Sequence, residues 1–265
     1  MEYNLTNIIL EEEFWKMKAL ITGASSGIGR EFAFLLAEKG YDLIITARRK
    51  ERLEDIKEKI KNVNVDIYVC DLSDEEECKK IFMNYPDIDI LINNAGYGVF
   101  GEFLKTELDK ELEMLNVNIK AVHILTKLYY TKMAEKNKGY ILNVASCASF
   151  SPGPLFSSYY ASKAYVLRLT QALSYELKKR KSKVRISVLC PGPVDTEFND
   201  VAGVKFGIGS VTAKYVAEYA LKMMFKNKMV IVPSLKIKFA RILSKLSPSA
   251  LSAAVVYRIQ KAKQE

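Results

Sequence analysis

The sequence contains a single histidine, His123, and only four cysteines, at positions 70, 78, 147 and 190. The cysteines are widely separated, form no C-x-x-C pair and are accompanied by no cluster of histidines. Zinc sites and disulfide frameworks depend on closely spaced ligands or paired thiols. We therefore expect no metal site and no disulfide framework, and we interpret the cysteines as reduced thiols of a cytoplasmic protein.

Long apolar runs are also missing, because no stretch reaches the ~18 uncharged apolar residues that a membrane-spanning helix requires. A soluble protein is the default expectation. The N-terminus, MEYNLTNIILEEEFWKM, carries three consecutive glutamates and lacks the basic leader of a secretory signal. Met17 directly precedes the first strand-like run, so we interpret residues 1–16 as an N-terminal extension.

An excess of one charge is absent from most of the chain. Residues 1–213 hold 29 Lys/Arg against 29 Asp/Glu, whereas residues 214–265 hold 11 basic and 2 acidic residues and so carry the whole net charge of +9. No motif beyond charge suggests nucleic acid as a partner, and we expect none. We interpret residues 236–265 as a basic C-terminal helical tail, in which KIKFARILSKL is amphipathic. We expect the tail to dock on its own domain or a neighbouring subunit, and contact with a membrane surface or an acyl carrier is the alternative.

The chain does contain a regular alternation of β-rich runs and helical patterns. Strands are expected at residues 18–22, 41–47, 65–71, 88–96, 139–146, 184–192 and 228–234. Helices are expected at residues 29–40, 48–62, 73–85, 107–135 and 157–180, the fourth interrupted near 116–118. Uncharged strands that alternate with helices indicate a parallel sheet covered on both faces. We predict an α/β fold over residues 17–235: a single Rossmann-like doubly wound domain with a mostly parallel seven-stranded sheet.

The first strand ends in ITGASSGIGR, which supports two interpretations. Gly23, Ser25 and Gly27 match the G-x-S-x-G elbow that presents the nucleophile of a serine hydrolase. That serine would need a base, and His123 lies among apolar helix positions. The hydrolase that uses Ser25 is therefore a remote alternative.

The second interpretation is a nucleotide-binding loop, since Thr22, Gly23, Gly27 and Gly29 spell T-G-x-x-x-G-x-G. Glycines allow the backbone to approach a pyrophosphate, and the following helix offers its N-terminus to the same group. A glycine-rich loop alone is weak support, because a plain turn between a strand and a helix would look similar. The other strand ends decide between the two.

Y-x-x-x-K occurs three times, as Tyr159/Lys163, Tyr175/Lys179 and Tyr257/Lys261. Only the first pair begins a helix soon after a strand and has a serine, Ser146, thirteen residues upstream. Together with the glycine loop and NNAG (93–96) after the fourth strand, this pattern resembles the short-chain dehydrogenase/reductase family over about residues 17–235. The other two pairs are interpreted as exposed helix pairs.

The resemblance implies a catalytic group of Tyr159, Lys163, Ser146 and Asn118, with Asn116 as a lower-ranked candidate for the last position. Tyr159 would act as the acid/base, and Lys163, one helical turn away, would lower its pKa. Ser146 would hydrogen-bond the substrate oxygen, and Asn118 would hold a water that links Lys163 to solvent.

The resemblance also implies a nicotinamide cofactor. The expected cofactor-binding residues are Gly23, Ser25, Ser26, Gly27, Ile28, Gly29, Arg48, Arg49, Asp71, Leu72, Asn94, Ala95, Gly96, Tyr159, Lys163, Pro191, Gly192, Val194 and Thr196. An NAD-specific site usually ends the second strand with an acidic residue, but here Ala47 is followed by Arg48 and Arg49. Because arginine suits a 2′-phosphate, we expect NADP(H) rather than NAD.

The expected activity is an NADP(H)-dependent interconversion of a ketone or aldehyde and its alcohol. The small-molecule substrate is expected to be fairly apolar, such as an acyl, steroid-like or xenobiotic carbonyl. Residues 199–211, NDVAGVKFGIGSV, are interpreted as a mobile substrate lid. We expect a homodimer or homotetramer that associates through helices 107–135 and 157–180. A protein that binds NADP(H) as a sensor or scaffold without turnover is the non-enzymatic alternative.

Overall fold

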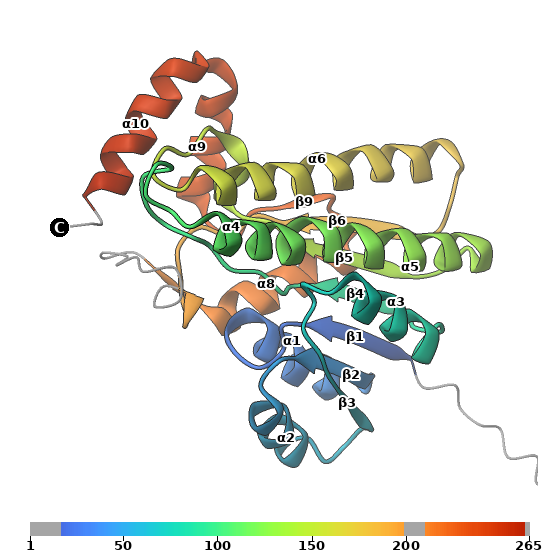
Figure 1. Ribbon diagram of the computed structural model, residues 1–265. Helices are drawn as coiled ribbons and strands as arrows, with labels where there is room; N and C mark the ends of the chain where they lie inside the picture. Colours follow the sequence, from blue (N-terminus) through green and yellow to red (C-terminus); the bar gives the residue numbers. More distant parts are fainter. Residues whose placement is uncertain (1–16, 199–209, 263–265) are drawn as a thin grey trace, which may run out of the picture.

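The computed structural model describes residues 17–198 and 210–262, and a parallel sheet forms its centre (Figure 1). Its seven strands lie in the order β3-β2-β1-β4-β5-β6-β9, and every neighbouring pair is parallel. The strands are β1 (Lys18–Thr22), β2 (Asp42–Ala47), β3 (Val65–Val69), β4 (Ile90–Asn93), β5 (Tyr140–Val144), β6 (Arg185–Leu189) and β9 (Val230–Ile231). Each expected strand is present, and the predicted doubly wound α/β fold is confirmed.

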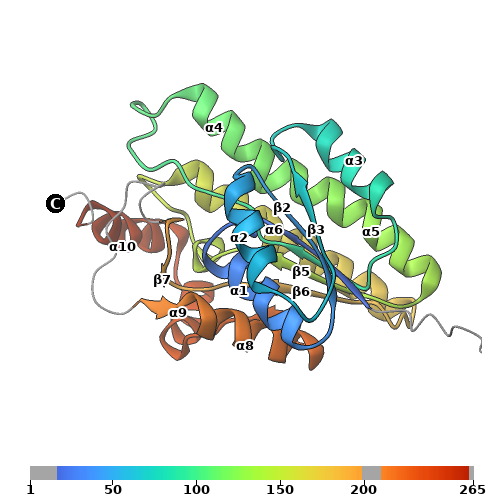
Figure 2. The ribbon, with the colours of Figure 1, turned by 90° about the horizontal axis from the view of Figure 1, so that it is seen from below.

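Helices cover both faces of the sheet because its strands are buried on both sides. One face packs against α1 (Gly27–Glu38), α2 (Lys50–Lys59) and α8 (Ala213–Phe225), and α1 and α8 lie side by side in Figure 2. The other face packs against α3 (Glu75–Asn84), α5 (Val122–Lys136) and α6 (Ser157–Lys179). The side chain of Asp74 caps α3 by accepting a hydrogen bond from the backbone N–H of Glu76.

The predicted interruption of the fourth helix is a π-helical turn, Asn116–Ala121, between α4 (Leu108–Leu115) and α5. The wider turn directs Val117 and Asn118 into the interior, where both are buried, and leaves Lys120 exposed in an ion pair with Glu75. Single π-helical turns within α-helices are frequently found at functional sites.

The order of the strands reverses between β1 and β4, so loops from both halves of the sheet gather at the carboxyl ends of these two strands. The segment after β6 runs along this edge and pairs β7 (Val194–Asp195) with β8 (Val211–Thr212). Most of the expected lid, residues 199–209, and the expected extension, residues 1–16, lie outside the described residues.

The C-terminal region forms two helices, α9 (Leu235–Leu246) and α10 (Ser249–Lys261), where the sequence indicated one amphipathic helix. α9 packs on its own domain: Arg241 lies over the ring of Phe150 at 5.4 Å, and Ile237 lies against Gly192. Within residues 17–198 and 210–262, no helix is long and apolar enough to cross a membrane. In the same ranges, no cluster of histidine, cysteine and acidic side chains could hold a metal ion.

Candidate active site

A cavity of about 630 Å³ lies at the carboxyl ends of the strands, where their order reverses. All of the predicted site residues line it except Gly29 and Asn118. Its walls come from the loops after β1, β2, β3, β4, β5 and β6, together with α6, α9 and α10. The structure therefore gathers into one place residues that the sequence separates by more than two hundred positions.

The glycine loop forms one end of the cavity. Gly23 has a φ of +64°, which favours glycine, and its backbone lies against Ala95. Gly29 does not line the cavity, but a Cβ there would stand 2.3 Å from the carbonyl oxygen of Gly23. The absence of that Cβ lets α1 begin directly beneath the loop, with its N-terminus at the cavity. Backbone N–H groups at a helix N-terminus bind anions, so the arrangement fits a pyrophosphate.

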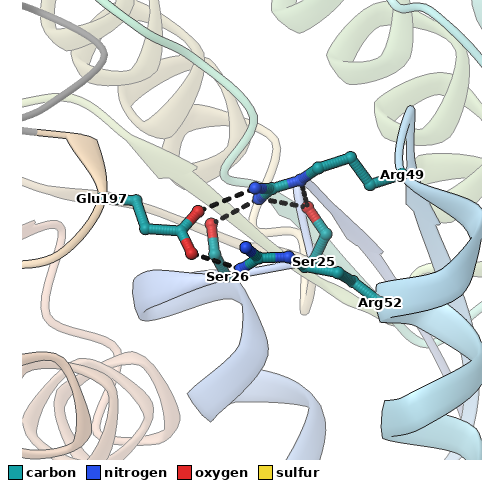
Figure 3. A network of polar contacts seen from close by, with 5 residues as sticks. All are labelled: Ser25, Ser26, Arg49, Arg52 and Glu197. Atoms are coloured by element: carbon teal, nitrogen blue, oxygen red, sulfur yellow. Dashed lines mark hydrogen bonds and ion pairs between the residues drawn. The ribbon is translucent and has the colours of Figure 1, made fainter.

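Arg49 lies beside this loop and connects it to the opposite wall (Figure 3). Its guanidinium donates to Ser25 Oγ at 3.0 and 3.3 Å, to Ser26 Oγ at 3.0 Å and to Glu197 Oε2 at 2.8 Å. Arg52, one turn along α2, also pairs with Glu197. Hydrogen bonds from Arg49 and then Arg52 hold the pKa of the Glu197 carboxyl below its usual range. Two arginines thus converge on one carboxylate.

Arg48 lies on a different side of the cavity from this cluster. Its guanidinium lies 3.5 Å from the Asp71 carboxylate and 3.2 Å from the Glu113 carboxylate. Burial raises the pKa of Asp71, but hydrogen bonds from Ser73 and the charge of Arg48 outweigh burial, so its pKa lies below the ordinary value. The pair Arg48 and Arg49 therefore does not act as one fork: Arg49, with Arg52, faces the glycine loop.

Tyr159 and Lys163 occupy one face of α6 and are both buried. Lys163 Nζ donates to the carbonyl oxygen of Val144 at 3.1 Å and lies 5.8 Å from the centre of the Tyr159 ring. Ser146, at the end of β5, hydrogen-bonds the Tyr159 hydroxyl. Phe156 stacks on the Tyr159 ring with centroids 4.5 Å apart, which fixes the position of the phenol.

The expected lowering of the Tyr159 pKa is wrong for this structure. Burial raises the pKa of the phenol, and the hydrogen bond with Ser146 opposes this rise without cancelling it. Burial also lowers the pKa of Lys163 to about 8, because an ammonium in an apolar wall loses its hydration. The sequence placed a cation near the phenol, but it could not show that both groups are removed from water.

Asn118 lies behind the cavity wall and does not face the cavity. Its Nδ2 donates to the carbonyl oxygen of Tyr97 at 2.9 Å and to Ser162 Oγ at 3.1 Å, and its Oδ1 accepts from the Tyr97 N–H at 3.2 Å. A Cβ on Gly96 would meet both Asn118 Oδ1, at 2.7 Å, and Lys163 Nζ, at 3.0 Å. The π-helical turn therefore brings Asn118 next to the buried amine.

Other candidate residues lie elsewhere. Lys179 Nζ lies over the ring of Tyr175 at the surface of α6, and Tyr257 and Lys261 are exposed on α10. His123 is exposed and pairs with Tyr165 Oη at 2.7 Å, outside the cavity. Ser25 therefore has no histidine beside it, and the hydrolase geometry is not formed. Asn93 donates to Asn143 and Thr126 in the core, which is a structural role.

Several residues of the cavity were not expected from the sequence. They include Phe150, Phe156, Tyr160 and Phe198 in the domain, and Ile237, Ala240, Val256, Ile259 and Gln260 in the two C-terminal helices. Gln260 Nε2 donates to Tyr160 Oη at 2.6 Å, and Gln260 Oε1 is buried without a partner among the described residues. Burial raises the pKa of Tyr160 to about 12. The part of the cavity beyond Tyr159 is therefore lined mainly by apolar side chains, and the amide of Gln260 lies among them.

Comparison with known proteins agrees with this geometry. The family model described as short chain dehydrogenase matches residues 17–207. The 3-oxoacyl-[acyl-carrier-protein] reductase FabG of Rickettsia conorii is 33% identical over 182 residues, which cover 69% of this chain and 74% of the relative. A short-chain dehydrogenase from Sphingobium yanoikuyae, solved with NADPH, has a TM-score of 0.78 at 29% identity and covers 83% of this chain and 88% of its own. A bulky-bulky ketone specific alcohol dehydrogenase from Comamonas testosteroni has a TM-score of 0.73 at 28% identity and covers 88% and 94%.

The chain belongs to the short-chain dehydrogenase family. It is an oxidoreductase that acts on CH–OH groups with a nicotinamide cofactor, NAD(P). Solved relatives have been obtained with NADPH and with NAD, so the comparisons leave the choice between the two cofactors open.

Proposed function

We propose that this protein reduces a ketone or aldehyde to its alcohol, and catalyses the reverse reaction, with NADP(H) as cofactor. The observation that carries the proposal is the placement of Ser146, Tyr159 and Lys163 on one wall of a cavity that ends at the glycine loop and Arg49. A proton donor, a second hydroxyl and a buried cation thus face the space that leads to an anion-binding loop.

Each residue of this wall has its own role in the proposed reaction. The bound cofactor supplies the hydride that the carbonyl carbon accepts. The Tyr159 hydroxyl gives its proton to the carbonyl oxygen, and the Ser146 hydroxyl donates a hydrogen bond to the same oxygen as negative charge develops. Lys163 compensates the phenolate that remains, and Asn118, whose Oδ1 lies beside Gly96 as Lys163 Nζ does, would hold a water that links the amine to solvent. In the reverse direction, the Tyr159 phenolate accepts the alcohol proton.

The preference for NADP(H) is supported by the cluster of Arg49, Arg52, Ser25 and Ser26. These side chains offer two guanidinium groups and two hydroxyls to an anion, and no acidic residue ends β2. A 2′-phosphate would replace the Glu197 carboxylate between the two arginines, whereas a ribose without phosphate would gain nothing from them. The position of Glu197 therefore supports a phosphate subsite between Arg49 and Arg52.

A fairly apolar substrate is supported by the wall around Tyr159. Phe150, Phe156 and Phe198 face the cavity from the domain, and Ile237 and Val256 face it from α9 and α10. A carbonyl compound with an extended hydrocarbon part would remove this surface from water.

A homodimer or homotetramer remains our proposal for the assembly. The helices expected to associate expose large apolar side chains, which are Leu108 and Leu112 on α4 and Tyr165 and Tyr175 on α6. Analytical ultracentrifugation tests the assembly, and a monomer would contradict it.

The proposal of a cytoplasmic protein is supported by Cys70, Cys78 and Cys190, which are buried as thiols.

A panel of ketones, aldehydes and secondary alcohols tests the activity, with oxidation of NADPH followed by absorbance and NADH in parallel. We expect faster turnover with NADPH and with apolar carbonyls. Equal or better use of NADH would contradict the phosphate subsite. Cofactor binding without turnover of any substrate would favour the sensor or scaffold alternative.

A further inference from the structure

The two C-terminal helices have an apolar surface that faces away from the cavity. On α9, Leu235, Phe239, Ile242 and Leu246 follow helical spacing and are 78%, 70%, 60% and 79% exposed. The residues of α9 that line the cavity, Ile237, Ala240 and Ser244, are offset from them by about half a turn. One side of α9 therefore closes the active site while the opposite side presents large apolar side chains to the surroundings.

The apolar surface continues along α10 to the rim of the cavity. Leu251, Val255 and Ile259 follow one another at four-residue spacing and are all exposed. Ile259 is 54% exposed and also lines the cavity. Figure 1 shows both helices at the outer edge of the molecule, next to the start of α6. We define the tail surface as these seven residues of α9 and α10.

The charged residues within the two tail helices all have one sign. Residues 235–262 contain no aspartate or glutamate. Lys236, Arg258 and Lys261 are exposed on the two helices, and Lys238 and Arg241 are half-buried beside them. Helices with exposed large apolar side chains and flanking basic residues are typical of proteins that lie on an anionic membrane surface.

We propose that the tail surface docks on an anionic lipid surface, with its apolar side chains among the acyl chains and its basic residues at the headgroups. A second copy of the chain fits less well, because a two-fold contact would bring the three exposed cations of each copy together. An acidic carrier protein would match the charges but not seven large exposed apolar side chains. Lipid accounts for both features.

The docked orientation has a consequence for the substrate. Because Ile259 belongs both to the tail surface and to the cavity rim, a lipid-dissolved carbonyl compound would reach the cavity without crossing bulk water. This consequence rests on the proposed reductase activity, whereas docking itself does not. Turnover of a water-soluble carbonyl therefore reports on the activity separately from binding to vesicles.

Vesicle co-sedimentation of the full chain tests the proposal. We expect binding to vesicles of equal phosphatidylcholine and phosphatidylglycerol, little binding to phosphatidylcholine alone, and weaker binding at high salt. The triple variant Lys236→Gln, Arg258→Gln, Lys261→Gln should lower the affinity on the order of a hundredfold, at about fivefold per charge. The matched control removes three exposed lysines elsewhere, Lys57→Gln, Lys61→Gln and Lys127→Gln, and should bind as the wild type does.

The apolar part is tested by Phe239→Ser with Leu246→Ser, neither of which lines the cavity. Met83→Ser on α3 is the control, because Met83 is equally exposed but distant in the fold. Loss of vesicle binding in the double variant alone, with unchanged turnover of a water-soluble carbonyl, supports the proposal. Wild-type protein that does not bind anionic vesicles would overturn it. A double variant that binds vesicles as the wild type does would also overturn it. A double variant whose molar mass in solution falls would overturn it as well, because the tail surface would then be a contact between copies of the chain.

Discussion

Replacing Arg49 with glutamine removes the guanidinium that joins the glycine loop to Glu197. A hydrogen bond to a charged group contributes about 1.5–3 kcal/mol. The Arg49 side chain is 43% exposed, so solvent screens its interaction with a phosphate. The low end of the range, about 1.5 kcal/mol, therefore applies and corresponds to about a tenfold weaker Kd for NADPH. NADH, which has no 2′-phosphate, should bind the variant nearly as well as it binds the wild type.

The variant Glu197→Gln should have the opposite effect. The carboxylate of Glu197 occupies both Arg49 and Arg52, so a phosphate must displace it. Exposed ion pairs contribute about 0.2–1 kcal/mol each, so the two together predict about a twofold to thirtyfold tighter Kd for NADPH. The affinity for NADH should again stay unchanged.

Isothermal titration calorimetry with both cofactors measures these effects. Lys57→Gln is the matched control, because Lys57 is an exposed cation near the other end of the same helix. The reasoning is refuted if Arg49→Gln weakens NADH as much as NADPH, or if Glu197→Gln weakens NADPH. Either result would mean that the cluster supports the loop rather than the phosphate.

Two further predictions concern the buried groups of the cavity. The folded-state pKa of Lys163 is about 8, below the lysine value of about 10.4 expected in the unfolded chain, so the unfolded chain binds the extra proton between these two pH values. The free energy of unfolding of the wild type relative to Lys163→Met should therefore rise by about 3 kcal/mol as the pH rises across this window. Urea unfolding measures this difference, and a difference that does not change with pH would contradict the burial of the amine. Gln260→Leu should lower kcat/KM about tenfold for carbonyl compounds that carry a second hydrogen-bonding group, with little effect on plain hydrocarbon ketones or on the Kd of NADPH. Equal losses for both substrate classes would show that Gln260 only supports Tyr160.

Most of the framework could be predicted from the sequence because its signals are local. Uncharged β-rich runs that alternate with helical patterns indicate a buried parallel sheet, and all seven strands form. The strand expected at residues 88–96 ends at Asn93, because Asn94 leaves the sheet to donate to the carbonyl oxygens of Thr22 and Gly23. The start of a helix soon after a strand, with Ser146 thirteen residues upstream, also separated Tyr159 and Lys163 from the other two Y-x-x-x-K pairs.

Features that depend on distant contacts were not predictable in this way. The sequence predicts a helical tail, but no local signal shows that α9 and α10 line the cavity. Arg52 follows Arg49 by three residues and could have been found from that spacing. Its shared partner, Glu197, lies 145 residues away from Arg52. The sign of the Tyr159 pKa shift depends on burial, which only the packing of Phe156 and Phe198 around the phenol reveals.

The central claim is that Tyr159 supplies the proton for carbonyl reduction. The most direct measurement is single-turnover oxidation of NADPH by Tyr159→Phe and by the wild type, with the Kd of NADPH measured in both. The Phe variant keeps the ring that stacks on Phe156 and loses only the hydroxyl. We predict a rate lower by about 10²- to 10⁴-fold with unchanged NADPH binding. A variant that retains a substantial part of the wild-type rate would contradict the account.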